Sequence, residues 1–198
     1  TKIKNYNFTM LTDNFIKYLK KNKLQNNQII VATFYKFIQL KNIIEIKNYF
    51  NIYSKHSNIR GTILLANEGI NGTIAGEKND LHRFLKKMSL HKEFYDLSPK
   101  YSICNKIPFL RLKIRLKKEI VTMGKKNIKP NEIVGSYVSP QDWNKFINQS
   151  ETLLIDTRND YEISIGSFKN AINPNINSFR DFPNWANKNL VKKNIFKN

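Results

Sequence analysis

The sequence predicts an α+β domain followed by the beginning of an α/β domain, and three observations favour this fold class. Between residues 29 and 104, segments follow one another in the order strand, helix, strand, strand, helix, strand. This order is typical of the split βαβ, or ferredoxin-like, arrangement, in which two helices cover one face of an antiparallel sheet. A stretch with Pro and Gly but little apolar periodicity comes next, and beyond it strand and helix patterns alternate as in a parallel sheet.

The first half of this pattern is a strand, a helix and a second strand. Residues 29–37, "IIVATFYKF", are β-branched and aromatic and too short for a free-standing helix, so they predict a buried strand. Residues 42–57 predict an amphipathic helix, because apolar side chains recur there at helical spacing: Ile43, Ile46, Tyr49, Phe50 and Tyr53. Residues 59–66 predict the second strand. Residues 1–28 are interrupted by Lys, Asn and Asp, and they predict an N-terminal extension that is not a secretory signal.

A glycine-rich stretch joins the second strand to the third. Residues 63–76, "ILLANEGINGTIAG", predict a turn around "NEGING" and a third strand over residues 73–75, because Gly supplies positive φ and Asn before Gly is a favoured turn pair. A strand follows the glycines, which excludes a Walker or Rossmann phosphate loop, since both need a helix there. Two interpretations remain open: a plain turn, or a loop in which Glu68 or Asn71 contacts a ligand.

The first domain then continues with a helix and an extended segment. The helix begins at about Asn79, and its apolar face consists of Leu81, Phe84, Leu85 and Met88. Residues 93–104, "EFYDLSPKYSIC", are predicted to be extended, with Pro99 marking an edge or a bend.

The segment "RLKIRLK", residues 111–117, predicts a strand with one apolar and one basic face. The basic face carries four cations: Arg111, Lys113, Arg115 and Lys117. From residue 100 to residue 129 there are ten Lys or Arg and one acid. Two interpretations remain open. The charges protect an edge strand against pairing with other sheets, or they contact nucleic-acid phosphates, with Tyr101 and Phe109 nearby to stack on a base.

The bulk composition narrows the class of protein. A net charge of +19 indicates a polyanionic partner, but 28 Lys against 6 Arg is also the usage of an AT-rich genome, so only the local placement of charge is persuasive. No apolar run reaches the roughly 20 residues of a membrane span. A single cysteine, Cys104, favours a reducing, cytoplasmic compartment. The three His residues stand far apart, so the sequence indicates no metal site, and it indicates no flavin site or protein partner either.

The sequence predicts a linker over residues 125–138 and a second unit over residues 139–198. A helix begins the second unit with three residues of a capping arrangement: Ser139, Pro140 and Asp142. Residues 152–156, "TLLID", then predict a short buried strand that ends in an acid.

The second unit contains motifs that resemble the first half of a rhodanese domain. In "LLIDTRNDYEISIGSFKNAINP", residues 153–174, a strand ends in Asp156-x-Arg158, and Glu162 follows in a Tyr-Glu pair. Together with "FYKF", "ILLANEGINGTIAG" and "RLKIRLKKEIVTMG", they make the chain resemble the N-terminal part of the rhodanese-type tRNA uridine hydroxylases over nearly all of residues 29–182. Ser167 departs from the pattern, because rhodanese domains commonly carry His after the Gly.

This resemblance implies a domain organisation and a function. Residues 29–124 form a ferredoxin-like, acylphosphatase-like domain that binds the tRNA anticodon arm, and residues 139–198 form the N-terminal half of a rhodanese-like domain. The family is a group of oxidoreductases that use molecular oxygen as a substrate to make 5-hydroxyuridine at the wobble position. Their chemistry depends on a cysteine in a rhodanese loop, which is expected just beyond Asn198. Cys104 is expected to be a buried, inert thiol that does not replace it.

Two other functions remain open. Rhodanese units also transfer sulfur through a cysteine persulfide, and the fold alone does not separate that reaction from hydroxylation. The third hypothesis is a non-catalytic tRNA-binding remnant, since the 60 residues from 139 to 198 are too few to close an α/β core.

Overall fold

The computed structural model describes residues 10–23, 28–124 and 135–191. The chain divides into two compact units, Thr1–Ile120 and Val121–Asn198. The predicted linker, residues 125–138, falls mostly on residues 125–134, which lie outside the described residues. In the described parts of the chain, no helix has the length and apolar character that crossing a membrane takes.

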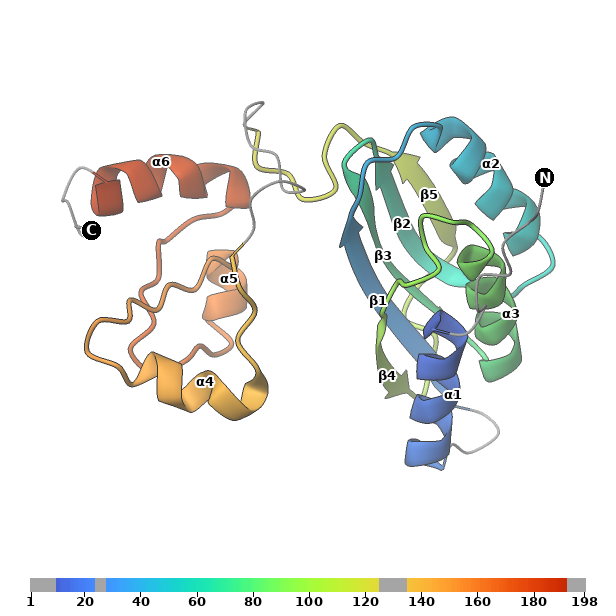
Figure 1. Cartoon of the computed structure of the whole chain (residues 1–198), viewed down its shortest axis with the longest axis horizontal. Coiled ribbons are helices and arrows are strands. Elements are labelled where there is room, and N and C mark those ends of the chain that lie inside the picture. Colours follow the sequence, from blue (N-terminus) through green and yellow to red (C-terminus); the bar gives the residue numbers. More distant parts are fainter. Residues whose placement is uncertain (1–9, 24–27, 125–134, 192–198) are drawn as a thin grey trace. The chain divides into compact units, whose positions relative to one another are not determined.

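Unit 1 is built on a five-stranded sheet (Figure 1). Its elements are, in chain order, α1 (Met10–Asn22), β1 (Ile29–Phe37), α2 (Ile43–Ser54), β2 (Arg60–Ala66), β3 (Gly69–Gly76), α3 (Lys78–Ser89), β4 (Lys100–Cys104) and β5 (Leu112–Leu116). The strand order is β4-β1-β3-β2-β5; the first four are antiparallel to their neighbours, and β5 pairs with β2 in parallel. The predicted α+β class of this domain is confirmed, and β5 adds a fifth strand to the split βαβ arrangement.

Helices α1, α2 and α3 lie on one face of this sheet (Figure 1). The sequence predicts only an N-terminal extension over residues 1–28, whereas α1 is part of unit 1. Its Leu11 and Phe15 are fully buried in the core, and Phe15 stacks on His82 of α3 with ring centroids 5.8 Å apart. The polar residues that interrupt this segment therefore belong to an amphipathic helix that packs on α3.

The core between the sheet and the helices is rich in aromatic side chains. The ring of Phe50 on α2 lies 5.9 Å from that of Phe84 on α3 and 5.7 Å from that of Phe94, measured between centroids. Burying one Phe side chain contributes roughly 1.5–3 kcal/mol, so these contacts hold both helices against the sheet. Gly72 of β3 makes room for Phe34 of β1, because a Cβ at Gly72 would lie 2.8 Å from the Phe34 ring.

The third strand begins earlier than the sequence predicts. It starts at Gly69 instead of residue 73, so the predicted six-residue turn "NEGING" shrinks to Asn67 and Glu68. Gly69 has a φ of +149°, and a Cβ there would lie 2.0 Å from the carbonyl oxygen of Lys36 on β1. The glycine thus allows β1 and β3 to pair right up to the turn.

The prediction of an extended segment over residues 93–104 is wrong for its first part. A turn occupies residues 91–96 and β4 begins only at Lys100. Within the turn, the Phe94 N–H donates to the His91 carbonyl at 2.8 Å, and the Leu97 N–H donates to the Phe94 carbonyl at 3.1 Å. Phe94 and Leu97 are both buried in the core, and this tertiary burial outweighs the local preference for an extended chain.

Unit 2 consists of short helices and loops. Its elements are α4 (Pro140–Ile147), α5 (Asp160–Ile163), the 3₁₀ helix η1 (Phe179–Asp181), α6 (Phe182–Ala186) and the π-helix η2 (Asn187–Val191). The predicted cap of α4 is confirmed, because Ser139 Oγ accepts a hydrogen bond from the Asp142 N–H at 3.1 Å.

The predicted buried strand over residues 152–156 is wrong. In the part of the chain that the structure describes, only Ile155 of this segment pairs with another segment, in an isolated parallel bridge to Ile172, and Leu153 is 37% exposed. A strand needs a paired neighbour along its length, and within the described residues this segment has a partner at one position only.

Candidate nucleic-acid interface

Strand β5 brings the four predicted cations together at one edge of the sheet. Ile114 in the middle of β5 is buried on the helix-covered face. Because successive side chains of a strand point to opposite faces, Lys113 and Arg115 lie on the other face. We call this the open face. Arg111 and Lys117 flank the strand with the same alternation.

The open face carries hydroxyl and basic side chains, and none of the five strands contains Asp or Glu. The strand pairing aligns one residue from each strand into a row that crosses the whole sheet: Lys100, Thr33, Thr73, Thr62 and Lys113. We call this the threonine row. The hydroxyl oxygens of Thr33 and Thr73 lie 3.2 Å apart. Since neighbouring strands are about 4.8 Å apart, the row spans about 19 Å between its two lysine Cα atoms.

The rows on either side add two cations and an aromatic ring. On one side, Arg60 of β2 lies in a row that continues through Ala75 of β3 and Val31 of β1 to the edge strand β4. On the other side, Arg115 of β5 belongs to the same row as Tyr35 of β1, which is 49% exposed.

No carboxylate of the described residues neutralises these cations. Within the described residues, none of the six basic side chains of the open face forms an ion pair: Arg60, Lys100, Arg111, Lys113, Arg115 and Lys117. Edge protection accounts for charge on β4 and β5, which form the two edges, but not for Arg60 on the inner strand β2. A basic surface without acids attracts polyanions.

The two polar residues of the glycine-rich turn both bind one backbone unit. Glu68 Oε1 accepts from the Ile120 N–H at 2.6 Å, and Asn71 Nδ2 donates to the Ile120 carbonyl at 3.1 Å. Ile120 is 3% exposed and is the last residue of unit 1. These bonds hold the segment that leaves β5, which favours the turn interpretation over the ligand-contact interpretation.

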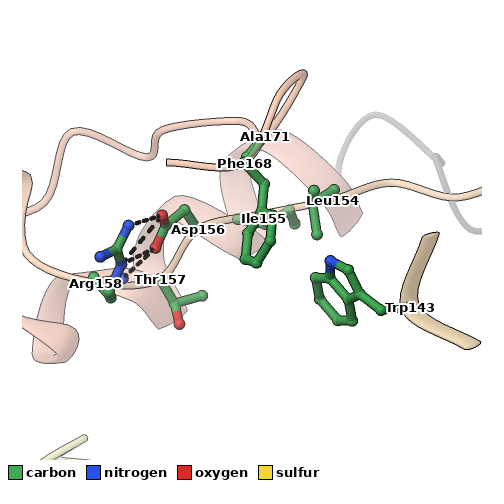
Figure 2. Close-up of a pocket in the computed structure, with 8 residues that line it drawn as sticks. All are labelled: Trp143, Leu154, Ile155, Asp156, Thr157, Arg158, Phe168 and Ala171. Atoms are coloured by element: carbon green, nitrogen blue, oxygen red, sulfur yellow. Dashed lines mark hydrogen bonds and ion pairs between the residues drawn. The ribbon is translucent and has the colours of Figure 1, made fainter. Parts of the chain in front are cut away.

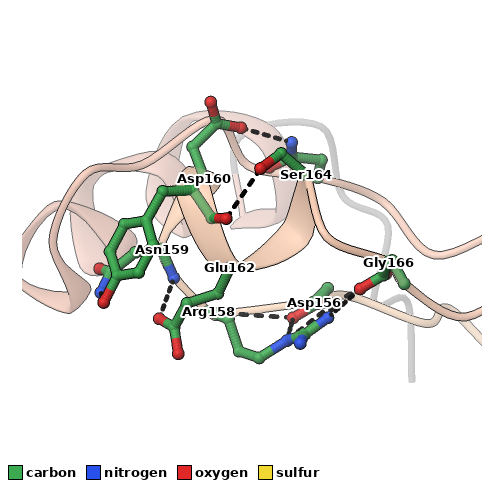
Figure 3. A network of polar contacts seen from close by, with 10 residues as sticks. Asp156, Arg158, Asn159, Asp160, Glu162, Ser164 and Gly166 are labelled. Atoms are coloured by element: carbon green, nitrogen blue, oxygen red, sulfur yellow. Dashed lines mark hydrogen bonds and ion pairs between the residues drawn. The ribbon is translucent and has the colours of Figure 1, made fainter.

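In unit 2 the Asp-x-Arg motif closes a polar loop (Figure 3). Arg158 Nε and Nη2 donate to the Asp156 carboxylate at 2.9 and 2.6 Å, and Nη2 also donates to the Gly166 carbonyl at 2.7 Å. Ser167 Oγ donates to the same carboxylate at 2.7 Å, so Ser167 has a structural role here. The hydrogen bonds from Arg158 hold the pKa of Asp156 well below its usual range, although burial opposes them.

The third motif residue, Glu162, caps helix α5. Its carboxylate accepts from the N–H of Asn159 at 3.1 Å, so one of the N–H groups at the start of the helix is satisfied (Figure 3). All three residues of the predicted rhodanese motif are therefore bound within the loop itself, and their geometry supports a structural role.

A cavity of about 260 Å³ lies beside this loop (Figure 2). It is lined by Trp143, Leu154, Ile155, Asp156, Thr157, Arg158, Phe168 and Ala171. The rings of Trp143 and Phe168 lie 5.0 Å apart between centroids, and the Asp156–Arg158 pair forms another part of the wall. The lining offers one hydroxyl and no thiol or imidazole, so it can enclose an apolar group but supplies no sulfur nucleophile.

The lone cysteine lies in the other unit. Cys104 ends the edge strand β4, opposite Ile29, and is half-buried. Across the residues that the structure describes, no three His, Cys, Asp or Glu side chains gather in a way that could hold a metal ion.

Comparison with known proteins connects this fold to a family. Residues 29–120 match the UPF0176 acylphosphatase-like domain, a range that contains the whole sheet and ends at Ile120. A tRNA uridine(34) hydroxylase from Rhizobium etli is 44% identical over 166 residues. Unit 1 is therefore similar to this domain, and the chain is similar to the hydroxylase over most of its length. The resemblance to tRNA uridine hydroxylases, inferred from the motifs, is thereby confirmed.

The similarity to the hydroxylase extends into both units of the chain. The aligned residues are 84% of the chain, more than the 120 residues of unit 1. The chain spans about half the length of the curated relative that it matches, 54%.

The sequence reveals the β5 cations but not the rest of the open face. Alternation within one segment was enough to place Lys113 and Arg115 together. Lys100, Arg60 and the threonine row are brought beside them only by pairing between distant strands. The lack of acids could be predicted for four of the five strand segments. The fourth was predicted over residues 93–104, which include Glu93 and Asp96, and only the late start of β4 leaves these acids outside the strand.

Proposed function

We propose that this protein takes part in the oxygen-dependent 5-hydroxylation of the wobble uridine, position 34, in tRNA, in the cytoplasm. The observation that carries the proposal is the 44% identity to a tRNA uridine(34) hydroxylase over 84% of the chain. Unit 1 supplies the physical basis for the substrate, because its acid-free open face presents unneutralised cations to an RNA.

In this proposal each unit has its own task. Unit 1 holds the tRNA anticodon arm through four cations at the β5 edge: Arg111, Lys113, Arg115 and Lys117. The wobble base lies in a single-stranded loop, so moving it into a pocket costs little unstacking. Unit 2 is the beginning of a rhodanese-like domain, in which Asp156, Arg158 and Glu162 shape a loop. Molecular oxygen is a substrate, and the resemblance implies that the reacting residue is a cysteine in a rhodanese loop.

The test is the tRNA of a strain from which the gene has been deleted. Mass spectrometry of its nucleosides is expected to show loss of the 5-hydroxyuridine modification, which the intact gene restores. A gene carrying Lys113→Glu and Arg115→Glu is expected to restore it poorly. Lys17→Glu with Lys86→Glu, the same charge change at exposed positions of α1 and α3, is expected to restore it fully.

Other outcomes separate the remaining functions. Loss of a thio group from tRNA would support sulfur transfer through a persulfide instead. If the tRNA of the deletion strain keeps its normal amounts of both the 5-hydroxyl and the thio group, the proposal is contradicted and a non-catalytic tRNA-binding role is favoured.

A further inference from the structure

We propose that a single-stranded segment of RNA lies across the open face, perpendicular to the strands, along the threonine row. The proposal rests on the proposed function, because the RNA is the loop of the anticodon arm. It goes further by assigning contacts to Lys100 and to the threonines, which lie outside β5.

The first argument is that the row has a cation at each end. Lys100 on β4 is exposed at one edge of the sheet, and Lys113 on β5 lies at the other edge. They are about 19 Å apart by strand spacing, a distance that a few nucleotides cover. An RNA backbone that crossed the face would therefore place phosphates near both Lys100 and Lys113. A backbone that followed β5 would pass Lys113 and the other β5 cations but would not reach Lys100.

The second argument concerns the middle of the row. Thr33, Thr62 and Thr73 present hydroxyl groups. One proton is shared between Thr33 and Thr73, so two hydroxyls of the row can donate to phosphates, while all three can accept from a base or a ribose 2′-hydroxyl. These groups are neutral, so they do not repel a polyanion. A protein partner is the less favoured occupant, since the centres of protein interfaces are depleted in Lys and Ser and enriched in apolar side chains.

The third argument separates a single strand from a duplex. The open face is a sheet surface, and within the described residues of unit 1 no helix lies on it that could enter a groove (Figure 1). Bases of a single strand can lie flat on such a surface. Tyr35, which is 49% exposed and lies two residues from Thr33 along β1, is placed to stack on one of them.

The experiment measures the binding of a fluorescein-labelled RNA hairpin, the anticodon arm of a tRNA with a wobble uridine, by fluorescence anisotropy on the full chain. Lys100→Glu is expected to weaken binding about tenfold, and Thr33→Val with Thr73→Val about fivefold. Thr33→Ser with Thr73→Ser keeps both hydroxyls and is expected to bind like the parent. Lys17→Glu, on the opposite side in α1, is the charge-matched control and is expected to change binding less than about twofold.

A competition measurement tests the single-strand element. The unlabelled loop sequence, as a linear oligonucleotide, is expected to displace the hairpin better than a duplex made from the stem. Better competition by the duplex would overturn the inference. Melting curves from circular dichroism show whether each variant remains folded.

The outcomes distinguish this inference from the proposed function. If Lys113→Glu with Arg115→Glu weakens binding while Lys100→Glu and the Thr→Val pair do not, the RNA follows the β5 edge, and only the inference fails. If none of these variants weakens binding, the role of unit 1 in the proposed function fails as well. A Thr→Val pair that leaves binding unchanged but alters the melting temperature would show that the hydroxyls serve the sheet alone.

Discussion

Glu68 is a turn residue whose carboxylate binds a backbone N–H 52 residues further along the chain. Replacing it with Ala leaves the N–H of Ile120, a 3% exposed residue, without this acceptor. Because an unsatisfied buried donor is costly, Glu68→Ala is expected to lower the free energy of unfolding by about 2 kcal/mol. Urea unfolding followed by circular dichroism measures this.

The neighbouring turn residue provides the control. Asn67 is exposed, and Asn67→Ala is expected to change the free energy of unfolding by less than about 0.5 kcal/mol. Equal effects of the two substitutions would contradict the backbone role of Glu68. If Glu68→Ala left stability unchanged and reduced tRNA modification instead, the ligand-contact interpretation would hold.

Asp156 is expected to make the stability of unit 2 depend on pH. Its pKa is lowered chiefly by hydrogen bonds from Arg158, so the folded state binds the proton less readily than the unfolded state does. The stabilisation is therefore complete above the ordinary Asp pKa of about 3.9 and is lost as the pH falls from there toward the lowered value. Asp156→Asn is expected to destabilise unit 2 at neutral pH, by an amount that shrinks below about pH 4.

Tryptophan fluorescence can follow this change. Both tryptophans of the chain, Trp143 and Trp185, lie in unit 2. Their urea transition is measured for the parent and the variant across this pH range. A difference that stays constant down to about pH 3 would contradict the assigned role of the carboxylate.

On the scale of elements, strand β5 should make RNA binding depend on salt. Each phosphate contact with a single strand contributes about 0.7 to the slope of log K against log salt concentration, so Lys113→Gln with Arg115→Gln is expected to lower the slope by about 1.4. The hairpin is titrated at several salt concentrations, with Lys17→Gln and Lys86→Gln as the matched control. An unchanged slope together with increased light scattering would support edge protection instead.

The elements that could be predicted are those whose pattern is complete within one segment. The run that forms β1 is β-branched and aromatic, α2 and α3 show their helical period directly, and the alternation in β5 shows its two faces. Helix α1 could not be predicted, because few of its side chains are buried, Leu11 and Phe15 among them, and because it is stabilised by packing on α3. The early start of β3 depends on a contact between Gly69 and the Lys36 carbonyl, which no local pattern contains.

The candidate site divides in the same way. The β5 cations follow from alternation, whereas the threonine row depends on the register of five strands, which long-range pairing sets. The segment at residues 152–156 was predicted as a strand from its composition and is not one in the structure. Its apolar run has the composition of a strand, but composition does not provide the neighbours that a strand pairs with.

At the scale of the whole chain, the two units differ in the amount of core they contain. Unit 1 buries a cluster of 20 hydrophobic residues between its helices and its sheet. Among the described residues of unit 2, only two large aliphatic side chains are buried, those of Ile176 and Leu190, while Ile165 is 87% exposed. Hydrophobic burial is the main source of folding free energy, so unit 2 should be the less stable of the two.

This difference predicts that the chain does not unfold in one step. In urea, the fluorescence of Trp143 and Trp185 should change at a lower concentration than most of the far-ultraviolet circular dichroism signal, because both tryptophans lie in unit 2 and most of the helix and all five strands lie in unit 1. Hydrogen exchange gives an independent reading: amides of β1 and β3, the central strands of the sheet, should exchange far more slowly than those of α4 and α5. Coincident transitions by both probes, with equal protection in the two units, would show that unit 2 draws its stability from unit 1.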